Sequence, residues 1–381
     1  MVNQEIMPLD IPQAQSNAWN RLSQIQKSNQ IGSAYLFSGP AGTGKEGLAI
    51  KFAQLLNCDN PSESPCESCP SCSRFQQLQH EKFTIIFPLP TPKKSSNEDE
   101  PTIVNKQDLD LVTDAIAKKA NDPFYKIQIP KANRILIQSV RELRKSLYLK
   151  TEKTGRKTVL IFDAHLLSAG QGEAANALLK ILEEPPENTT LILVTDYVEL
   201  LLPTILSRCQ KIGIPKLPDE FVHSWLAQKM VKESDIPFIT GLSQGNIHQA
   251  RHLKSQSIAD LLKLIGGLIK TLTNENPDHW RKFTQTYSRL ASQDLATFSF
   301  HFKLLKIWFR SVSRLQKHVP DMLHDTSLKP AMDRLIQSHP NADFSAIAFE
   351  LEEAILSVPQ NLYMPLILTN LLLRIQKHLS P

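Results

Sequence analysis

The sequence predicts an α/β domain built on a parallel sheet, followed by a region that contains only helices. Three observations lead to this fold class. Strand and helix patterns alternate through the first half of the chain, as in βαβ units. Residues 159–162 and 191–194 are uninterrupted apolar runs, typical of central parallel strands that are covered on both faces. From about residue 219 onward, only helical periodicity remains.

Local patterns place the elements of the first half. Short apolar runs indicate strands, and apolar residues at helical spacing on one face indicate helices. The dipeptide Pro185-Pro186 ends the strongest of these helices. We expect strands at residues 34–38, 84–87, 159–162 and 191–194, and helices at residues 45–57, 137–147 and 173–184.

The second half contains helical patterns that change character twice. A helix is expected at residues 221–232, a short acidic-capped unit begins at Ser234, and another helix begins at Gly245. Long amphipathic helices follow. We therefore expect three domains, at residues 1–215, 216–255 and 256–381. The long helices are expected at residues 259–272, 279–291, 295–317, 347–358 and 362–379.

Length and composition restrict the function classes. A chain of 381 residues exceeds what one hydrophobic core usually organises. With 41% apolar and 21% charged residues, a disordered, collagen-like or coiled-coil chain is excluded. The net charge of +5 is spread along the chain and supports a nucleic-acid partner only weakly. Neither a secretory signal nor an apolar run of membrane-spanning length is apparent, so we expect a cytoplasmic protein with no membrane partner.

One segment, residues 88–133, interrupts the alternating pattern. It begins with three prolines in five residues and continues into the acidic run 98–100. Such a stretch cannot bury enough apolar surface to form a core of its own. We expect an extended surface insertion with one helix near residues 108–119, in which Lys93 and Lys94 are solvated. The sequence assigns this insertion no role.

A phosphate-binding loop follows the first predicted strand. Gly39, Gly42 and Gly44 precede Lys45 with the spacing G-x4-G-K, at the start of a helix. In this context backbone N–H groups converge on phosphate oxygens, and the lysine reaches the terminal phosphates. The next position, however, is Glu46 instead of the Ser or Thr whose hydroxyl binds Mg²⁺.

The strand at 159–162 has a second departure from an ATPase pattern. Asp163 ends this strand, where a carboxylate would orient the metal's water shell. The following residue is normally the Glu that polarises the attacking water, and here it is Ala164, which can neither accept a proton nor orient water. Two losses at the two chemical positions argue against hydrolysis in this chain, while ATP and Mg²⁺ binding is left open.

Four cysteines lie within fifteen residues. Cys58, Cys66, Cys69 and Cys72 have the spacing C-x7-C-x2-C-x2-C, which suits a tetrahedral Zn²⁺. The loop has little core of its own, so a structural metal would supply folding energy. An iron–sulfur cluster or a redox pair are the alternatives. Cys209 lies far away in sequence and is expected to be a plain buried or semi-buried thiol.

Together these motifs resemble the delta-prime subunits of the bacterial replicative clamp loader, in the AAA+ superfamily. The resemblance covers nearly the whole chain. The most specific part is the segment from Asn176 to Pro186 together with Ser207-Arg208-Cys209. The other landmarks, in order, are residues 34–37, the four-cysteine insertion at 58–72, residues 159–163 and the C-terminal residues 361–366 and 371–373.

The resemblance implies a fold, partners and site residues. The fold would be a RecA-like AAA+ domain, a small helical lid and a helical collar for oligomerisation. In this family the Arg of the Ser-Arg-Cys motif reaches the ATP site of a neighbouring subunit, and Arg208 matches it. Thr195 matches the sensor-1 position. His248 stands where ATP-binding members carry Arg, and an ordinary helix residue is the expected role for it.

The function so implied is that of a non-hydrolysing member of a hetero-oligomeric ring. It would close the ring beside the motor subunits and the delta subunit, and supply Arg208 in trans as an arginine finger. The assembled ring would open the sliding clamp and place it on primer-template DNA, as part of the DNA polymerase III holoenzyme. An active motor ATPase is the first alternative. A zinc-stabilised nucleic-acid-binding adaptor outside any clamp loader is the second.

Overall fold

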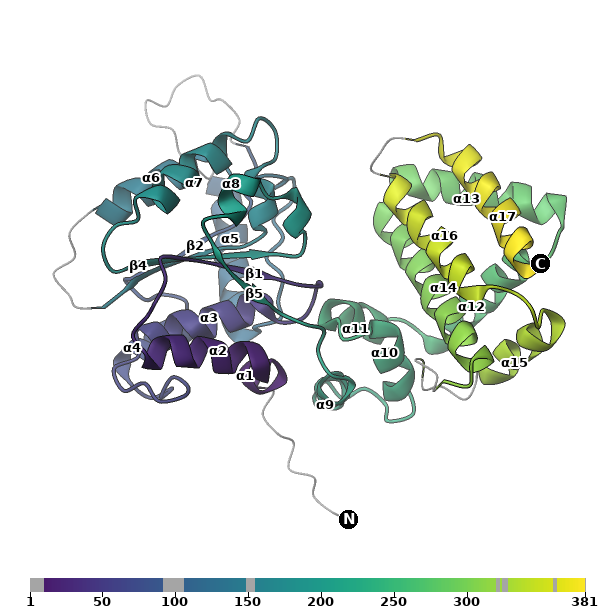
Figure 1. The fold of residues 1–381 in the computed structure, drawn as a ribbon, viewed down its shortest axis with the longest axis horizontal. Helices are drawn as coiled ribbons and strands as arrows, with labels where there is room; N and C mark the ends of the chain where they lie inside the picture. The colour runs from purple at the N-terminus through teal and green to yellow at the C-terminus, as the bar shows by residue number, and fades with distance from the viewer. Residues whose placement is uncertain are drawn as a thin grey trace, which may run out of the picture. The chain divides into compact units, whose positions relative to one another are not determined.

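The computed structural model describes residues 10–91, 106–148, 155–319, 323, 328–358 and 362–380 (Figure 1). The chain divides into two compact units. The first comprises Met1–Phe221 with Gly245–His248, and the second comprises Val222–Gln244 with Gln249–Pro381. The three domain boundaries expected from the sequence stay a prediction.

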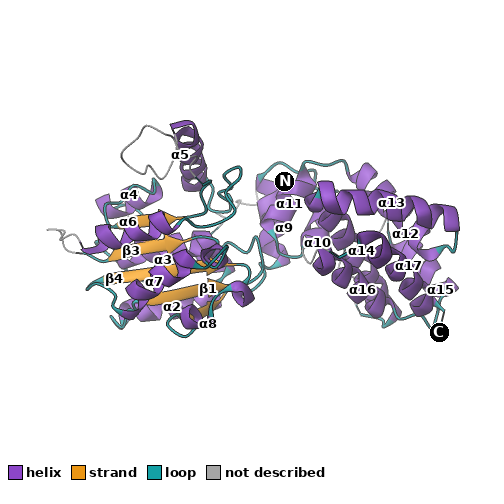
Figure 2. Cartoon of the chain, turned by 90° about the horizontal axis from the view of Figure 1, so that it is seen from above, coloured by secondary structure: helices purple, strands orange, loops and turns teal. Residues whose placement is uncertain are grey.

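The first unit is built on a five-stranded, wholly parallel sheet with the order β2-β3-β4-β1-β5 (Figure 2). The central strand β4 is buried along its whole length, as its apolar run predicts. Its Leu191 pairs with Ala34 on one side and with Val159 on the other. The strands are β1 (Ala34–Ser38), β2 (Phe83–Ile86), β3 (Lys157–Ile161), β4 (Thr189–Thr195) and β5 (Gln210–Gly213).

Helices cover both faces of this sheet, because successive strand residues point to opposite sides. Leu36 belongs to a core shared with α6 (Ile137–Tyr148) and α7 (Glu173–Glu183), while its neighbours Tyr35 and Phe37 pack against Phe52 of α3 (Lys45–Leu56). Figure 1 shows the two layers, with α6 and α7 on one side of the sheet and α2 and α3 on the other. The parallel α/β class predicted from the sequence is confirmed.

Several elements of this unit were not expected from local patterns. They include the edge strand β5, which has a single buried residue, Ile212, and so lacks an apolar run. The structure also contains helices α1 (Ile11–Ala14), α2 (Ser16–Lys27), α4 (Pro70–Gln76) and α8 (Pro203–Leu206), and the 3-10 helices η1 (Ala164–Leu167) and η2 (Val198–Leu200).

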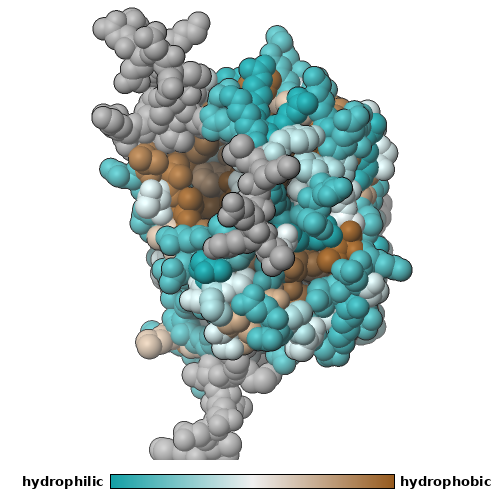
Figure 3. Space-filling model, turned by 90° about the vertical axis from the view of Figure 1, so that its left-hand side faces the viewer, coloured by the Kyte–Doolittle hydropathy of each residue, from teal (hydrophilic) through white to brown (hydrophobic). Residues whose placement is uncertain are grey.

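Seen from the side in Figure 3, most of the visible surface is hydrophilic, and hydrophobic areas are interrupted by polar ones.

From Asp219 onward, the described residues form helices and contain no strand. The longest of these helices, α14 (Leu295–Gln316), has an aromatic core in which the rings of Phe298 and Phe302 stack at 4.2 Å. Among the described residues of the whole chain, none of the helices combines the length and the apolar character needed to cross a bilayer. The other helices are α9 (Asp219–Gln228), α10 (Ile236–Ser243), α11 (Ile247–Lys254), α12 (Ile258–Thr273), α13 (Pro277–Gln293), α15 (Lys329–Ser338), α16 (Phe344–Ser357) and α17 (Met364–Leu379).

The insertion at residues 88–133 differs from the extended surface segment expected from its composition. The expected helix is present as α5 (Lys106–Asn121). After α5 the chain turns inward, and Phe124, Ile127 and Ile129 are buried, as is Ala115 within the helix. Lys93 and Lys94 lie outside the described residues. The described part of the insertion, residues 88–91 and 106–133, is therefore part of the packed first unit.

Candidate nucleotide site and cysteine cluster

The phosphate loop connects β1 to α3, with Gly44 in the left-handed region at φ 82° directly before the helix. Its glycines are also required by close packing. A Cβ atom on Gly39 would lie 1.9 Å from the carbonyl oxygen of Ile214, and one on Gly42 would lie 1.9 Å from the amide oxygen of Asn246. The motif's small residues are therefore necessary to this fold whether or not a phosphate binds.

The loop lysine, Lys45, is directed toward protein groups. Its ammonium lies 2.6 Å from the Asp196 carboxylate and donates to the carbonyl oxygen of Pro40. The side chain is only 3% exposed. Burial lowers the pKa of Lys45, against the opposing effect of Asp196. In this geometry the cation that would meet a terminal phosphate is already paired.

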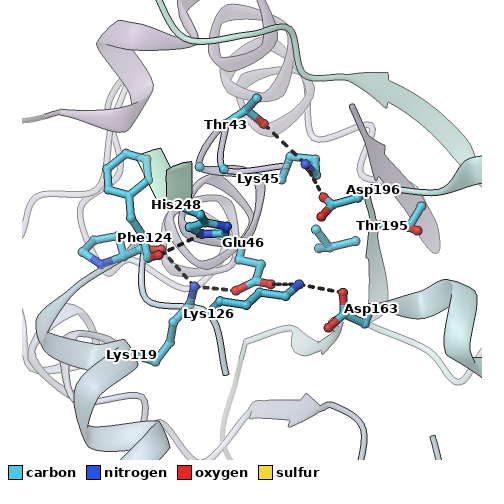
Figure 4. Close-up of a pocket in the computed structure, with 14 residues that line it drawn as sticks. Thr43, Lys45, Glu46, Lys119, Phe124, Lys126, Asp163, Thr195, Asp196 and His248 are labelled. Carbon is cyan, nitrogen blue, oxygen red and sulfur yellow. Dashed lines mark hydrogen bonds and ion pairs between the residues drawn. The ribbon is translucent and has the colours of Figure 1, made fainter. Parts of the chain in front are cut away.

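Glu46, the unusual residue after the loop lysine, is held between two lysines of the insertion (Figure 4). Lys119 Nζ lies 2.5 Å from one carboxylate oxygen and Lys126 Nζ lies 3.0 Å from the other. Burial by itself raises the pKa of the Glu46 carboxyl, but the two ammonium groups outweigh it and lower the pKa to about 2. Glu46 is thus a permanent carboxylate at physiological pH.

Asp163 completes this chain of charges at the end of β3. Its Oδ1 accepts from Lys126 Nζ at 2.6 Å, so Lys126 lies between two carboxylates. Both carboxylates raise the pKa of Lys126 and outweigh the effect of its burial. The next residue, Ala164, is fully buried and offers no polar group. Thr195 is buried beside these residues, with its Oγ1 at 3.1 Å from His165 Nδ1.

His248, expected to be an ordinary residue of its helix, contacts the insertion. Its Nε2 donates to the carbonyl oxygen of Phe124 at 3.0 Å, and the ring lines the same pocket as Glu46. Burial lowers the pKa of His248, so the imidazole is neutral near pH 7. His248 therefore fastens the start of α11 to the insertion.

A nucleotide does not fit among these side chains. The cavity that remains between the loop, the insertion and the end of β4 has a volume of about 20 Å³. This is room for about one water molecule, whereas small-molecule ligands occupy pockets of roughly 300–1,000 Å³. Lysine side chains and their carboxylate partners line this space on several sides. No step of a nucleotide reaction can be derived from this arrangement.

Arg208 is not part of that cavity. It follows α8 on the surface of the first unit, and its side chain is 34% exposed. One guanidinium nitrogen donates to Glu183 Oε1 at 2.8 Å, and the other donates to the carbonyl oxygen of Thr204 at 2.9 Å. These two bonds orient Arg208 on the surface, and it does not line the cavity beside the phosphate loop. Cys209 beside it is a buried thiol, as expected.

The four cysteines of residues 58–72 converge. Their sulfur atoms all lie within 4.8 Å of one another, and those of Cys66 and Cys72 are 4.0 Å apart. Four thiolates around a tetrahedral zinc with Zn–S bonds of about 2.3 Å lie roughly 3.8 Å apart. Backbone N–H groups of Cys66, Cys69 and Cys72 donate to sulfur atoms of the cluster at 3.3–3.4 Å. The donor set and its spacing fit a metal ion bound by four protein ligands.

Local sequence patterns did not predict the residues that close the phosphate-loop pocket. Lys119, Lys126 and Asp196 bear no motif, and the two lysines come from a segment that was expected to be solvated. One feature of the sequence does indicate that a buried cation is needed here. A glutamate at position 46, between the phosphate-loop lysine and an apolar helix, must be buried and therefore needs a cation supplied from elsewhere in the chain.

Comparison with known proteins agrees with this fold. The family model described as DNA polymerase III, delta subunit matches residues 14–218, which is more than half of the chain. The chain is 28% identical over 257 residues to DNA polymerase III subunit delta' of Pseudomonas aeruginosa, covering 66% of this chain and 65% of that protein. It is 28% identical over 248 residues to DNA polymerase III subunit tau of Bacillus subtilis, covering 62% of this chain and 36% of that protein.

The chain therefore belongs to the DNA polymerase III delta-subunit family and has the AAA+ fold of a clamp-loader subunit. The resemblance seen in the sequence is confirmed at this level. The chain spans less than two thirds of the first relatives above, and the relatives include both delta' and tau proteins. Among solved structures, a DNA polymerase III gamma subunit-related protein from Thermotoga maritima is 18% identical, with a TM-score of 0.39 over 94% of this chain and 99% of that one.

Proposed function

We propose that this chain is a delta'-type clamp-loader subunit that does not hydrolyse ATP. The observation that carries the proposal is the state of the phosphate loop. Lys45 is paired with Asp196, Glu46 is paired with two lysines, and Ala164 replaces the residue that would activate water. A motor subunit needs each of these positions open to nucleotide, metal or water. We therefore assign the degenerate site a structural role, and neither ATP nor Mg²⁺ is a cofactor of this subunit.

Arg208 is the residue through which such a subunit would act on its neighbour. The guanidinium is a planar, permanent charge, and it is exposed on a surface of the first unit. Its hydrogen bonds to Glu183 and Thr204 orient it before any partner arrives. Placed against the γ-phosphate of an adjoining motor subunit, it would stabilise the negative charge that develops in the transition state.

The partners follow from the family and from the surface of the second unit. We propose a hetero-oligomeric ring with motor subunits and a delta subunit, which loads the sliding clamp on primer-template DNA. Helices α16 and α17, together with the residue directly before α17, carry large apolar side chains that are more than half exposed, which is unusual unless a neighbouring subunit covers them. They are Phe349, Leu356, Tyr363, Leu366 and Leu373.

We further assign the four cysteines to a structural Zn²⁺. Cys58, Cys66, Cys69 and Cys72 would provide all four ligands, which leaves no open position for catalysis. The ion would hold the loop before α4 against α3, in a segment with little core of its own.

An assembled loader tests the arginine. Arg208→Ala, reconstituted with the motor subunits, the delta subunit, the clamp and primed DNA, should assemble normally. Removal of an arginine finger lowers hydrolysis at the affected site by about 10³-fold or more, so the loader should lose that site's share of its DNA-stimulated ATPase rate. Arg21→Ala is the matched control, because Arg21 is also exposed and donates to a backbone carbonyl. Unchanged hydrolysis by the Arg208 variant, or brisk hydrolysis by the purified chain alone, would contradict the proposal.

A further inference from the structure

The insertion reaches the phosphate loop through a lysine that is fully bonded inside the protein. Lys119 lies in the last turn of α5 and its side chain is 1% exposed. Its ammonium donates to Glu46 Oε2 at 2.5 Å, to the carbonyl oxygen of Tyr125 at 2.7 Å and to that of Pro123 at 2.9 Å. All three N–H groups are therefore used. The lysine ties the turn after α5 to the first turn of α3.

A second lysine from the same turn occupies a more specific position. Lys126 Nζ lies 3.0 Å from Glu46 Oε1 and 2.6 Å from Asp163 Oδ1. In phosphate-loop enzymes, the residue after the loop lysine and an aspartate of a second strand, here matched by Asp163 at the end of β3, are the two protein groups that hold Mg²⁺. Figure 4 shows the ammonium between these two carboxylates.

We propose that the insertion is a built-in plug of the nucleotide site, in which the Lys126 ammonium replaces the divalent cation and Lys119 neutralises the remaining charge of Glu46. This rests on the proposed function, because it explains how a subunit that does not hydrolyse ATP keeps its phosphate loop folded. The plug consists of Lys119, Lys126 and the turn between them. His248 fastens the plug on its other side through the carbonyl oxygen of Phe124.

Charge balance supports this assignment. The cluster contains three ammonium groups and three carboxylates, and its side chains are between 1% and 21% exposed. A buried charge is tolerated only when it is paired, so each carboxylate of the cluster needs a lysine beside it. A bound Mg²⁺ or triphosphate would upset this balance and displace the lysines. The paired groups are Lys45 with Asp196, Lys119 with Glu46, and Lys126 with Glu46 and Asp163.

A pair of substitutions at one position distinguishes a cation substitute from an ordinary buried lysine. Lys126→Ala leaves two carboxylates facing a space that an ion can enter, whereas Lys126→Met removes the same charge but fills the space. Ca²⁺ and Mg²⁺ are suitable probes because these hard cations bind oxygen ligands and avoid the thiolates of the cysteine cluster. Ca²⁺, which accepts oxygen ligands at about 2.3–2.6 Å, requires the smaller adjustment of the two carboxylates.

The experiment is thermal unfolding of the full chain with and without Ca²⁺ or Mg²⁺. Both variants should unfold at lower temperature than the wild type. At a Ca²⁺ concentration about ten times its Kd, Lys126→Ala should recover about 3–6 °C in Tm, and Lys126→Met should recover nothing. The control is Lys118→Ala on α5, because Lys118 is 54% exposed and lies outside the cluster. The wild type and this control should not respond to either cation.

Three results would overturn the inference: no recovery of Lys126→Ala by either cation, equal recovery of the Met variant, or stabilisation of the wild type by Mg²⁺ with ATP. The last result would mean that the lysines move aside for nucleotide. These measurements use the isolated chain and no other subunit. Failure of the plug is therefore distinguishable from failure of Arg208 to act in the assembled loader.

Discussion

Glu46 offers the most direct test of the charge cluster, through the substitution Glu46→Gln. Glutamine has nearly the same size and keeps an oxygen that can accept from one lysine. It removes the negative charge that two buried ammonium groups share. The variant therefore resembles a protonated Glu46 at neutral pH without creating a cavity, and its stability reports the loss of the charge together with the loss of one acceptor oxygen.

The stability that Glu46→Gln should lose follows from the pKa of Glu46. A change from the usual 4.5 to about 2 on folding corresponds to about 3 kcal/mol of stability at neutral pH. For a unit of about 200 residues, a loss of this size lowers the Tm by roughly 6–12 °C. Removal of one member of a buried ion pair costs about 3–5 kcal/mol in other proteins, which agrees with this value.

The lowered pKa of Glu46 also determines how the stability of the protein changes with pH. Because folding lowers the pKa of Glu46, its contribution is present above pH 4.5 and is lost as the pH falls from 4.5 toward about 2. The wild type should lose about 3 kcal/mol over that interval from this group, and Glu46→Gln should lack that part of the acid dependence. The two proteins should therefore approach equal stability near pH 2.

Urea and thermal unfolding at pH 7 and across the acid range measure both effects. Asp114→Asn on α5 is the control, because Asp114 pairs with Lys118 on the exposed face of the helix. It should not change the Tm measurably. A Glu46→Gln protein as stable as the wild type at pH 7 would show that the two lysines do not stabilise the carboxylate, and the reasoning would fail.

Three further predictions concern other parts of the chain. Cys66→Ser should lower the zinc content of the purified protein, measured by elemental analysis, while circular dichroism retains the sheet; wild-type protein without zinc would refute the metal site. Gly39→Ala should cost about 2–4 kcal/mol in urea unfolding, because its Cβ would lie 1.9 Å from the Ile214 carbonyl oxygen; a neutral effect would refute that packing. Leu366→Asp should leave the chain folded, since this side chain is 65% exposed, but should reduce co-purification with clamp-loader partners; unchanged recovery would exclude this surface.

The parallel sheet could be predicted because its central strands are fully covered. Burial on both faces forces an uninterrupted apolar run, and residues 191–194 show one. The edge strand β5 has no such requirement, and its pattern carries only Ile212 as a buried residue. Short helices such as α4 were missed for a similar reason, because packing against the cysteine loop stabilises them more than any periodicity of their own.

The candidate site could be predicted only in part. Its motif residues follow strands and begin helices, so position in the sequence locates them. Lys119 and Lys126 act across 73 and 80 residues of sequence, and a pairing of that range leaves no local pattern. Composition also misleads here, because the aliphatic stem of a lysine can be buried when its ammonium finds acceptors. Lys119 has three of them.

The phosphate loop shows why a motif alone does not establish a ligand. Gly39 and Gly42 are needed here by Ile214 and Asn246, and Lys45 is needed by Asp196. These contacts would preserve the G-x4-G-K pattern without any nucleotide. What separates the two cases is the residue after the lysine and the source of its counter-charge. A hydroxyl there leaves room for a metal ion, whereas the Glu46 carboxylate requires a cation from within the chain, and the insertion supplies it.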